Sequence, residues 1–481
     1  MDDAFHDRPE HPEEACGVFG VFAPGEDVGR MTYFGLHALQ HRGQESAGIA
    51  VADGTSLTAY KNLGLVTQVF RPSDLDSLTG HLAIGHTRYS TTGSSTSWEN
   101  AQPQLSSIGP NTIALAHNGN LVNTVQLREG LKSKGIRFRS TSDTEVMVTL
   151  IDHFTQAHGS IRAGIVEAMR LIRGAYSAVM MTEEAVYAFR DPYGVRPLAL
   201  GKLDDRGWAI ASETCGLDII GAEHVRDVGP GEVVKLSEAG VESEQAVPAE
   251  KPSLCVFEFI YFARPDSVMY DCTLYEARER MGAALARSAP VEADMVMGVP
   301  DTGIPGAIGF ANASGVPFGE GLVKNRYVGR TFISPTQLMR QQGIRLKLNP
   351  LRYALAGKRV VVVDDSIVRG NTTRKLVALL REAGAAEVHM RITSPPVKWP
   401  CFYGIDTDTQ EQLIASSNDV EAIRAHIGAD SLAYLSIEDM VSAIDHEHEG
   451  DFCMACFDGR YPIEIPDTVK RGKLALETAE S

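Results

Sequence analysis

The chain has 481 residues, too many for one ordinary hydrophobic core, so two domains are expected. Its apolar content of 43% and charged content of 22% are typical of globular proteins, and no run approaches the roughly 18 apolar residues of a membrane helix. The net charge of −17 argues against general binding to nucleic acids or to anionic membranes.

The first fifteen residues, MDDAFHDRPEHPEEA, contain six acidic residues, one arginine and no apolar stretch. They lack the apolar core of a secretory signal, and the expected location of the protein is therefore the cytoplasm. A β-type run, CGVFG, begins abruptly at Cys16. This change makes residues 1–15 a candidate pro-segment.

Short apolar segments separated by turn residues predict a series of strands in the first half of the chain: 48–51, 82–85, 113–116, 178–181, 186–189, 209–211 and 233–236. Helical patterns at 143–154 and 161–170 lie between them. This mixture predicts sheets packed on one another with helices outside. Residues 238–252 have few apolar side chains and predict a connector.

Polar clusters end several of these apolar runs, where site residues tend to lie. The sequence GHTRYS occupies 85–90, HNGN occupies 117–120, and SDTE at 142–145 opens a helix that Ser142 or Asp143 can cap. Each cluster alone is explained as well by a turn or a cap. The occurrence of all three clusters in one chain with CGVFG at 16–20 is not explained by separate turns and caps.

This combination resembles the class II glutamine amidotransferases, which are N-terminal nucleophile (Ntn) hydrolases with an αββα sandwich. The resemblance implies that Cys16 attacks the glutamine carboxamide as a thiolate, with its own α-amine as the base once residues 1–15 are removed. It also implies an oxyanion hole formed by Asn118 and the Gly119 N–H. Arg88 would bind the α-carboxylate of glutamine, and Asp143 its α-ammonium group.

From residue 275 strands and helices alternate, which is typical of an α/β domain. A strand at 295–299 leads into the loop PDTG at 300–303, and a helix follows to about 313. The four valines at 360–363 predict a strand buried on both faces. A helix to about 383, stopped by Gly384, and a strand at 388–392 complete a βαβ unit.

The loop after the four valines has the chemistry of a phosphate and ribose site. Small and hydroxylated residues at a helix start can hold a phosphate, whereas Asp364 and Asp365 would repel phosphate but bind sugar hydroxyls and Mg²⁺. The loop resembles the 5-phosphoribosyl 1-diphosphate (PRPP) motif of type I phosphoribosyltransferases. An ordinary doubly wound strand that ends in two solvated aspartates is the alternative.

This second resemblance assigns one Mg²⁺ per subunit, together with PRPP, to Thr302, Asp364 and Asp365. It assigns the 5-phosphate to the loop made of Ser366, Ile367, Val368, Arg369, Gly370, Asn371 and Thr372.

Between Glu320 and Asp364 there are nine basic residues and no acidic one. Residues 322–350 are polar and poorly periodic, which predicts a long loop of the kind that serves as a lid. A basic surface without a site is the alternative. Beside the PRPP-like loop a polyanionic ligand is favoured, and Arg330 and Lys347 would neutralise its diphosphate.

Seven cysteines in such a chain do not predict a disulfide framework. Cys453 and Cys456 form a CxxC pair, for which zinc, redox chemistry and a plain turn compete. Cys215 and Cys272 match no motif, and we expect them to pack in the interior.

The two sets of motifs span roughly residues 16–460 and together resemble the amidophosphoribosyltransferase family, in its branch with a pro-segment and an iron–sulfur cluster. The resemblance implies a structural [4Fe–4S] cluster on Cys255, Cys401, Cys453 and Cys456, with zinc as the alternative. It implies that ammonia from glutamine attacks C1 of PRPP, which starts purine synthesis. Purine nucleotides are the expected inhibitors and a homo-oligomer, a tetramer, the expected assembly.

The predicted plan is a pro-segment (1–15), an Ntn-type amidotransferase domain (16–250), a linker (251–274), a phosphoribosyltransferase domain (275–465) and a tail (466–481). Two other functions remain open. A nucleotide-sensing regulator with a phosphoribosyltransferase fold is disfavoured by the net charge and by the intact aspartate pair. A sugar-aminating amidotransferase is disfavoured by the PRPP-like loop.

Overall fold

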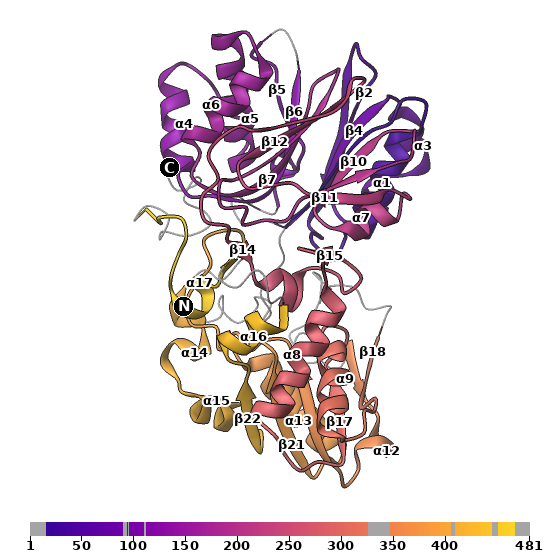
Figure 1. Ribbon diagram of the computed structural model, residues 1–481, viewed down its shortest axis with the longest axis vertical. Helices are drawn as coiled ribbons and strands as arrows, with labels where there is room; N and C mark the ends of the chain where they lie inside the picture. The colour runs from indigo at the N-terminus through magenta and orange to yellow at the C-terminus, as the bar shows by residue number, and fades with distance from the viewer. Residues whose placement is uncertain are drawn as a thin grey trace.

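The computed structural model describes residues 16–89, 94, 96–109, 112–325, 347–405, 409–444 and 451–466. It has two domains joined by a linker, with the N-terminal domain above the C-terminal domain in Figure 1. The predicted pro-segment, Arg330 and residues 467–481 lie outside the described residues. Across the described ranges, no helix is both long enough and apolar enough to cross a membrane.

Two antiparallel sheets form the middle of the N-terminal domain. The first has the order β11-β9-β10-β1-β4-β2-β3. Its strands are β1 (Gly17–Phe22), β2 (Ser46–Ala52), β3 (Leu57–Leu63), β4 (Leu82–Arg88), β9 (Ala199–Lys202), β10 (Trp208–Ala211) and β11 (Glu223–Asp227).

The second sheet has the order β13-β12-β8-β7-β6-β5. Its strands are β5 (Gln104–Ser106), β6 (Ile113–Leu121), β7 (Gly174–Met181), β8 (Val186–Arg190), β12 (Glu232–Ser237) and β13 (Gly240–Gln245).

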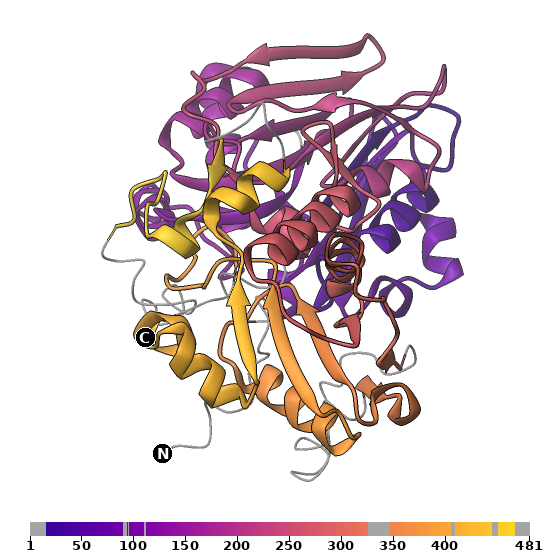
Figure 2. The same cartoon turned by 60° about the horizontal axis from the view of Figure 1, so that its bottom comes forward.

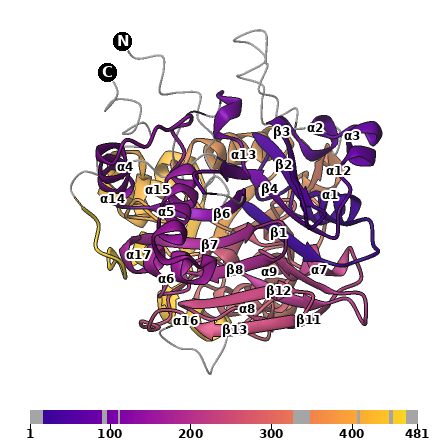
Figure 3. The same cartoon turned by 90° about the horizontal axis from the view of Figure 1, so that it is seen from above.

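The two sheets face each other across an apolar core to which both contribute, for example Val18 and Ile84 from the first and Val179 and Val186 from the second. Helices cover the outer faces (Figure 3). The first sheet is covered by α1 (Val28–Ala38), α2 (Val66–Val69), α3 (Pro72–Ser77) and α7 (Thr214–Asp218), and the second by α4 (Thr124–Ser133), α5 (Asp143–His158) and α6 (Ile161–Leu171). The predicted αββα sandwich is confirmed.

The prediction of a connector at 238–252 is wrong in its first part. Gly240–Gln245 forms strand β13, which pairs with β12 along its whole length. The sequence GVESEQ has no strand pattern because β13 lies at the edge of its sheet, where none of its residues is buried. Polar residues at such an edge also discourage pairing with other chains.

The predicted linker, 251–274, is built of short structured pieces. Strand β14 (Leu254–Cys255) pairs in parallel with β23 (Phe452–Cys453), which lies near the C-terminus. A π-helix, η2 (Glu258–Phe262), follows, and then the small hairpin of β15 (Val268–Met269) and β16 (Cys272–Thr273). The linker therefore packs between the domains rather than crossing solvent.

The C-terminal domain contains a parallel sheet of order β17-β20-β21-β22, whose arrows point the same way in Figure 2. Its strands are β17 (Met295–Gly298), β20 (Arg359–Asp364), β21 (Glu387–Ile392) and β22 (Ser431–Tyr434). Val361 and Val363 pack on one side and Val360 and Val362 on the other, so the strand predicted to be buried on both faces is confirmed.

Helices lie on both sides of this sheet. On the side of Val361 are α8 (Leu274–Ser288), α9 (Gly303–Ser314) and α16 (Ile437–Ile444), and on the other are α13 (Asn371–Glu382), α14 (Ile414–Ser417) and α15 (Val420–Ile427). The smaller elements are η1 (Trp98–Asn100), α12 (Arg352–Leu355), η3 (Gln410–Gln412) and α17 (Ala455–Asp458).

The predicted long loop at 322–350 has a structured base. Strand β18 (Leu322–Lys324) pairs antiparallel with β19 (Leu348–Pro350), and the N–H of Asn325 donates to the Lys347 carbonyl at 2.8 Å. This ribbon returns the chain to the point where it left the domain. Residues 326–346, between its strands, lie outside the described residues.

Candidate active sites

Cys16 directly precedes β1, beside strand β4. Because Gly17 pairs with Thr87, Cys16 lies next to the end of β4, and its thiol donates to the Tyr89 carbonyl at 3.1 Å. The side chain is 5% exposed, and burial raises the pKa of the thiol to about 12. The thiol is therefore protonated at neutral pH, and an attack by its sulfur needs a base.

Arg88 ends strand β4 and is almost fully buried. Its Nη1 donates to the Ser94 carbonyl at 3.4 Å and lies 3.8 Å from Glu45 Oε2. The guanidinium is close enough to Cys16 to oppose the effect of burial on the thiol pKa. A carboxylate of a small ligand could pair with it there.

Asn118 and Gly119 lie in β6, opposite Ser177 and Tyr176 of β7. Asn118 is fully buried, yet among the described residues neither its amide nitrogen nor its amide oxygen has a hydrogen-bond partner. Gly119 has φ +141°, and a Cβ there would lie 1.9 Å from the Ala175 carbonyl oxygen, so the position requires glycine. An unused buried donor of this kind suits a developing oxyanion.

Asp143 is the first residue of α5, and Ser142 caps the helix by accepting from the Thr144 N–H at 3.2 Å. Asp143 Oδ2 lies 3.5 Å from His117 Nε2 and accepts from the Leu121 N–H at 3.3 Å. Burial opposes ionisation, but His117 and these hydrogen bonds outweigh it and lower the pKa of Asp143. The carboxylate stays charged and can bind an ammonium group.

The structure thus brings five sequence-predicted positions into one buried neighbourhood. Arg88 and Asp143 both act on the pKa of the Cys16 thiol, although they lie in different secondary-structure elements. The carboxylate of Asp143 approaches the strand that contains Asn118 and Gly119, because it accepts from Leu121 of that strand.

The aspartate pair lies at the carboxyl end of β20, with Asp364 and Asp365 both nearly inaccessible to solvent. Thr302 Oγ1 donates to Asp365 Oδ2 at 2.5 Å, and Ser366 Oγ donates to Asp365 Oδ1 at 2.8 Å. Burial and the neighbouring Asp365 raise the pKa of Asp364 well above its usual value. Two adjacent buried carboxylates and a hydroxyl are hard oxygen donors whose negative charge a Mg²⁺ ion would relieve.

The loop from Ser366 to Gly370 turns the chain from β20 into α13. Gly370 ends the loop with φ +80°, and helix α13 begins at Asn371. Val368 accepts from the Ile414 N–H at 2.8 Å, and Arg369 Nη2 donates to Gln412 Oε1 at 2.7 Å. Of the other predicted loop residues, Ile367 has a buried side chain. Asn371 and Thr372 are the first residues of the helix, where free N–H groups can bind a phosphate.

Two basic residues at the base of the predicted lid are described. Lys347 is exposed just before β19. Lys324 Nζ lies 2.5 Å from Asp301 Oδ2, which ties β18 to the loop that contains Thr302. This ion pair had no local signal in the sequence, since its partners are 23 residues apart.

The four cysteines predicted to hold a cluster share one neighbourhood. Cys255 lies directly opposite Cys453 in the β14–β23 ladder, and burial together with the three other thiols raises the pKa of Cys456. All four are free thiols. As they stand, no group of three or more His, Cys, Asp or Glu side chains within the described ranges has the arrangement of a metal site.

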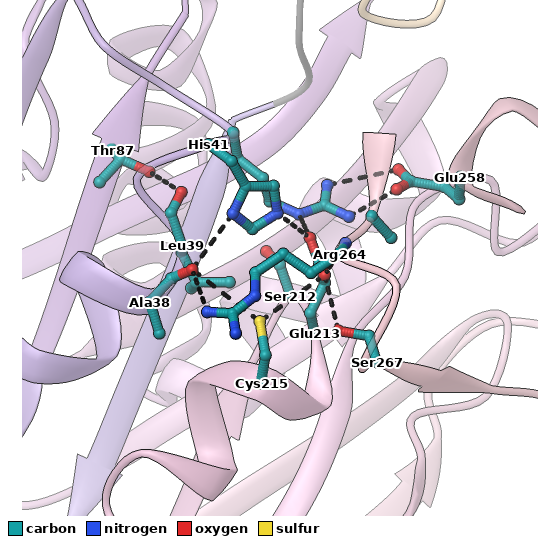
Figure 4. Close-up of polar contacts among 12 residues, drawn as sticks. Ala38, Leu39, His41, Thr87, Ser212, Glu213, Cys215, Glu258, Arg264 and Ser267 are labelled. Carbon is teal, nitrogen blue, oxygen red and sulfur yellow. Dashed lines mark hydrogen bonds and ion pairs between the residues drawn. The ribbon is translucent and has the colours of Figure 1, made fainter. Parts of the chain in front are cut away.

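A buried polar network joins the N-terminal domain to the linker (Figure 4). Arg42, which is inaccessible to solvent, pairs with Glu213 and, at 2.5 Å, with Glu258 of the π-helix. Glu213 also accepts from Ser267 Oγ at 2.7 Å and from the Arg264 N–H at 2.8 Å.

No local pattern in the sequence indicates this network. Arg42 is 171 residues from Glu213 and 216 residues from Glu258 in the sequence, so no local spacing could reveal these pairs. The predicted packing role of Cys215 and Cys272 agrees with the burial of both thiols.

Two family models match the chain. A glutamine amidotransferase domain matches residues 86–218. A phosphoribosyl transferase domain matches residues 274–393.

Curated relatives match almost the whole chain. The amidophosphoribosyltransferase of Synechococcus elongatus is 58% identical over 475 residues, 98% of this chain and 96% of that protein. The amidophosphoribosyltransferase of Mycobacterium leprae is 53% identical, covering 97% of this chain and 85% of that protein.

Solved structures also match nearly the whole chain. The glutamine PRPP amidotransferase of B. subtilis, complexed with ADP and GMP, has a TM-score of 0.88 at 48% identity and covers 94% of this chain and 98% of that chain. A structure described as the allosteric regulatory enzyme of purine biosynthesis has a TM-score of 0.90 at 47% identity and covers 96% of this chain and 99% of that chain.

Proposed function

The chain belongs to the amidophosphoribosyltransferase family, and we infer that it converts PRPP, glutamine and water to 5-phosphoribosylamine, glutamate and diphosphate, the first step of purine synthesis. Its amidotransferase domain releases ammonia from glutamine, and its phosphoribosyltransferase domain adds that ammonia to the ribose. The sites and cofactors described next are our proposals for how this chain performs the reaction.

In the glutamine half-reaction, Cys16 Sγ attacks the side-chain amide carbon and forms a thioester as ammonia leaves. Water then hydrolyses the thioester to glutamate. Arg88 and Asp143 hold the α-carboxylate and the α-ammonium group, and both charges are already buried beside the thiol. Asn118 and the Gly119 N–H stabilise the oxyanion, which is supported by the unpartnered amide of Asn118.

The proton on the Cys16 thiol needs an acceptor, and we propose the α-amine of Cys16 itself. In the 481-residue chain that nitrogen is a peptide nitrogen, which cannot accept a proton. Removal of residues 1–15 would free an amine that titrates near pH ~8, while burial holds the thiol protonated until the amine acts. The full-length chain would then be a precursor without glutaminase activity.

In the second half-reaction, Asp364 and Asp365 orient the ribose and the loop from Ser366 to Thr372 holds the 5-phosphate. Thr302, Asp364 and Asp365 would hold Mg²⁺, which offsets the charge of the departing diphosphate when it is bound. Lys347, at the base of the lid, and Arg330 within it would add positive charge beside the diphosphate. The ion pair between Lys324 and Asp301 supports this placement, because it joins the lid base to the loop that contains Thr302.

Cys255, Cys401, Cys453 and Cys456 would together hold a [4Fe–4S] cluster, with four-thiolate zinc as the alternative. The shared neighbourhood of four free, largely buried thiols supports this proposal. The group would join the linker strand β14 to the C-terminal strand β23, which is a structural role.

Nucleotide control is a proposal that the B. subtilis relative supports, since it was solved with ADP and GMP bound. We propose that purine nucleotides also inhibit this enzyme. A homo-oligomer, expected as a tetramer, is likewise proposed and can be measured by light scattering.

The observation that supports this mechanism most is the meeting of Cys16, Arg88, Asp143 and the unpartnered Asn118 in one buried neighbourhood. Intact mass spectrometry of the purified enzyme tests the proposed nucleophile. We expect the mature chain to begin at Cys16 and a glutamine-derived thioester to form there. A fully active enzyme that retains residues 1–15 would contradict the proposed base.

A further inference from the structure

Arg196 is a buried arginine of the N-terminal domain that reaches both the linker and the C-terminal domain. It lies between β8 and β9 and is fully inaccessible to solvent. Its Nε and Nη2 both donate to the Tyr403 carbonyl, at 3.1 and 2.9 Å, and its Nη1 donates to Glu258 Oε1 at 3.3 Å. One guanidinium therefore holds three parts of the chain together.

The segment that Arg196 holds, residues 401–404, packs against strand β6 of the glutamine site. Asn120 Nδ2 donates to the Phe402 carbonyl at 2.9 Å. Gly404 has φ +115°, and a Cβ at this position would lie 3.3 Å from Gly119 Cα and 3.0 Å from Arg196 Nη2. The 401–404 segment is thus in close contact with the backbone of the proposed oxyanion hole.

The backbone of Arg196 is fixed from the same strand pair. Ser177 Oγ donates to the Arg196 carbonyl at 2.7 Å, and Ser177 is the residue directly opposite Asn118 in the β6–β7 ladder. The main chain of Arg196 is therefore anchored to the residue that faces Asn118, while its side chain holds the segment that contacts Gly119. The charge of Arg196 is balanced by Glu258, which Arg42 also contacts.

We propose that Arg196 is a positioning residue for the glutamine half-reaction. By holding the 401–404 segment against β6, it sets the geometry of the Asn118 amide and the Gly119 N–H. It does not touch substrate. This inference rests on the proposed role of Asn118 and Gly119 as the oxyanion hole.

The test compares binding of a transition-state mimic with binding of the product. The γ-aldehyde of glutamate adds to a cysteine thiolate and places an oxyanion in the hole, whereas glutamate forms no such oxyanion. In the purified mature enzyme, which begins at Cys16, Arg196→Met should lower the glutamine-dependent kcat and the affinity for the aldehyde by the same factor, about tenfold or more. The affinity for glutamate and the ammonia-dependent rate should not change.

Gly404→Ala tests the same contact without removing a buried charge. Its new methyl group would press on Gly119 and Arg196, so the same parallel loss of kcat and aldehyde affinity is expected. Gly357→Ala is the matched control, because Gly357 also has a positive φ, +72°, but nothing lies within 4 Å of a Cβ there. It should cost stability alone.

Arg190→Met is the control for loss of a buried arginine. Arg190 is buried like Arg196 and donates to the Val228 and Gly194 carbonyls; it also contacts Tyr270 of the linker, but none of these partners lies in the 401–404 segment. It should lower the free energy of unfolding without changing aldehyde affinity. Arg196→Lys keeps the charge beside Glu258 but not the two bonds to Tyr403, and should fall between Arg196→Met and the unmodified enzyme.

Aldehyde binding that requires Cys16 but is unchanged in Arg196→Met and Gly404→Ala would overturn this inference alone. An equal loss of ammonia-dependent synthesis would also overturn it, since it would indicate general damage to the fold. Aldehyde binding that survives Cys16→Ala would instead overturn the proposed glutamine site, and this inference with it.

Discussion

Asn118→Ala separates catalysis from stability more sharply than any other change at the glutamine site. It removes one proposed oxyanion donor, which is worth ~3 kcal/mol of transition-state stabilisation and predicts a loss of roughly 100- to 1000-fold in glutamine-dependent kcat. In the folded enzyme the amide is buried with neither polar atom partnered among the described residues. Since burial of such a group costs ~1–3 kcal/mol, we expect the free energy of unfolding to stay the same or rise despite the small cavity.

Turnover is measured with glutamine and separately with ammonia, and stability by urea denaturation. The matched control is Asn123→Ala, because the Asn123 side chain makes two hydrogen bonds, to the Leu171 carbonyl at 2.9 Å and from the Arg173 N–H at 3.0 Å. That variant should lose ~1–3 kcal/mol of stability and keep its turnover.

The opposite pattern for Asn118→Ala would refute this reasoning. A variant that is destabilised but turns over glutamine normally would show that Asn118 serves the fold and not the oxyanion. Loss of ammonia-dependent synthesis would show that the change reaches the ribosyl site.

Three further changes test other parts of the account. Asp365→Asn should raise the KM for PRPP by about tenfold or more with either nitrogen donor, because a carboxylate that faces the sugar and Mg²⁺ is lost; saturation curves that match those of the unmodified enzyme would count against this role. Glu213→Gln should destabilise the fold at neutral pH by less than the ~3–5 kcal/mol of a fully unpaired buried charge, because Arg42 would lose this partner but keep Glu258. Burial opposes ionisation of Glu213, but Arg42 and His41 outweigh it and hold the pKa of Glu213 well below the ordinary 4.5. The ionised Glu213 therefore stabilises the fold above pH 4.5, and this stabilisation is lost as the pH falls below that value. The acid unfolding curve of the variant should lack this pH dependence. Anaerobically purified enzyme should contain about four iron atoms and four sulfides per chain, Cys456→Ser should lose them, and a preparation with zinc alone would end the cluster proposal.

The elements that could be predicted were those whose pattern is local. The strand of four valines, its two aspartates and the helix stopped at Gly384 follow from a short apolar run and its flanking residues. The αββα layers followed from the resemblance, since alternation of short strands and helices alone also fits other mixed folds.

The tertiary setting overrides local composition elsewhere. Strand β13, which composition assigned to a connector, is polar because it is a sheet edge, and the exact start of helix α13 depends on Gly370, whose positive φ ends the loop. The internal structure of the linker had no local signal either, since strand β14 pairs with β23, and Phe452, the partner of Leu254, lies almost two hundred residues away in the sequence.

The candidate site residues were named from their motifs, but not the groups that hold them in place. Arg196, Glu258 and the 401–404 segment come from three regions of the chain, and only the fold brings them beside Gly119. Sequence spacing reports which residues a reaction needs, whereas their support depends on contacts between distant segments.

The central claim is that one chain makes ammonia at Cys16 and uses it at Asp364 and Asp365. The direct measurement is product analysis of Cys16→Ala supplied with PRPP and either glutamine or ammonia. We predict that this variant forms no glutamate from glutamine but still releases diphosphate when ammonia is added. Glutamate formation at the rate of the unmodified enzyme would contradict the account.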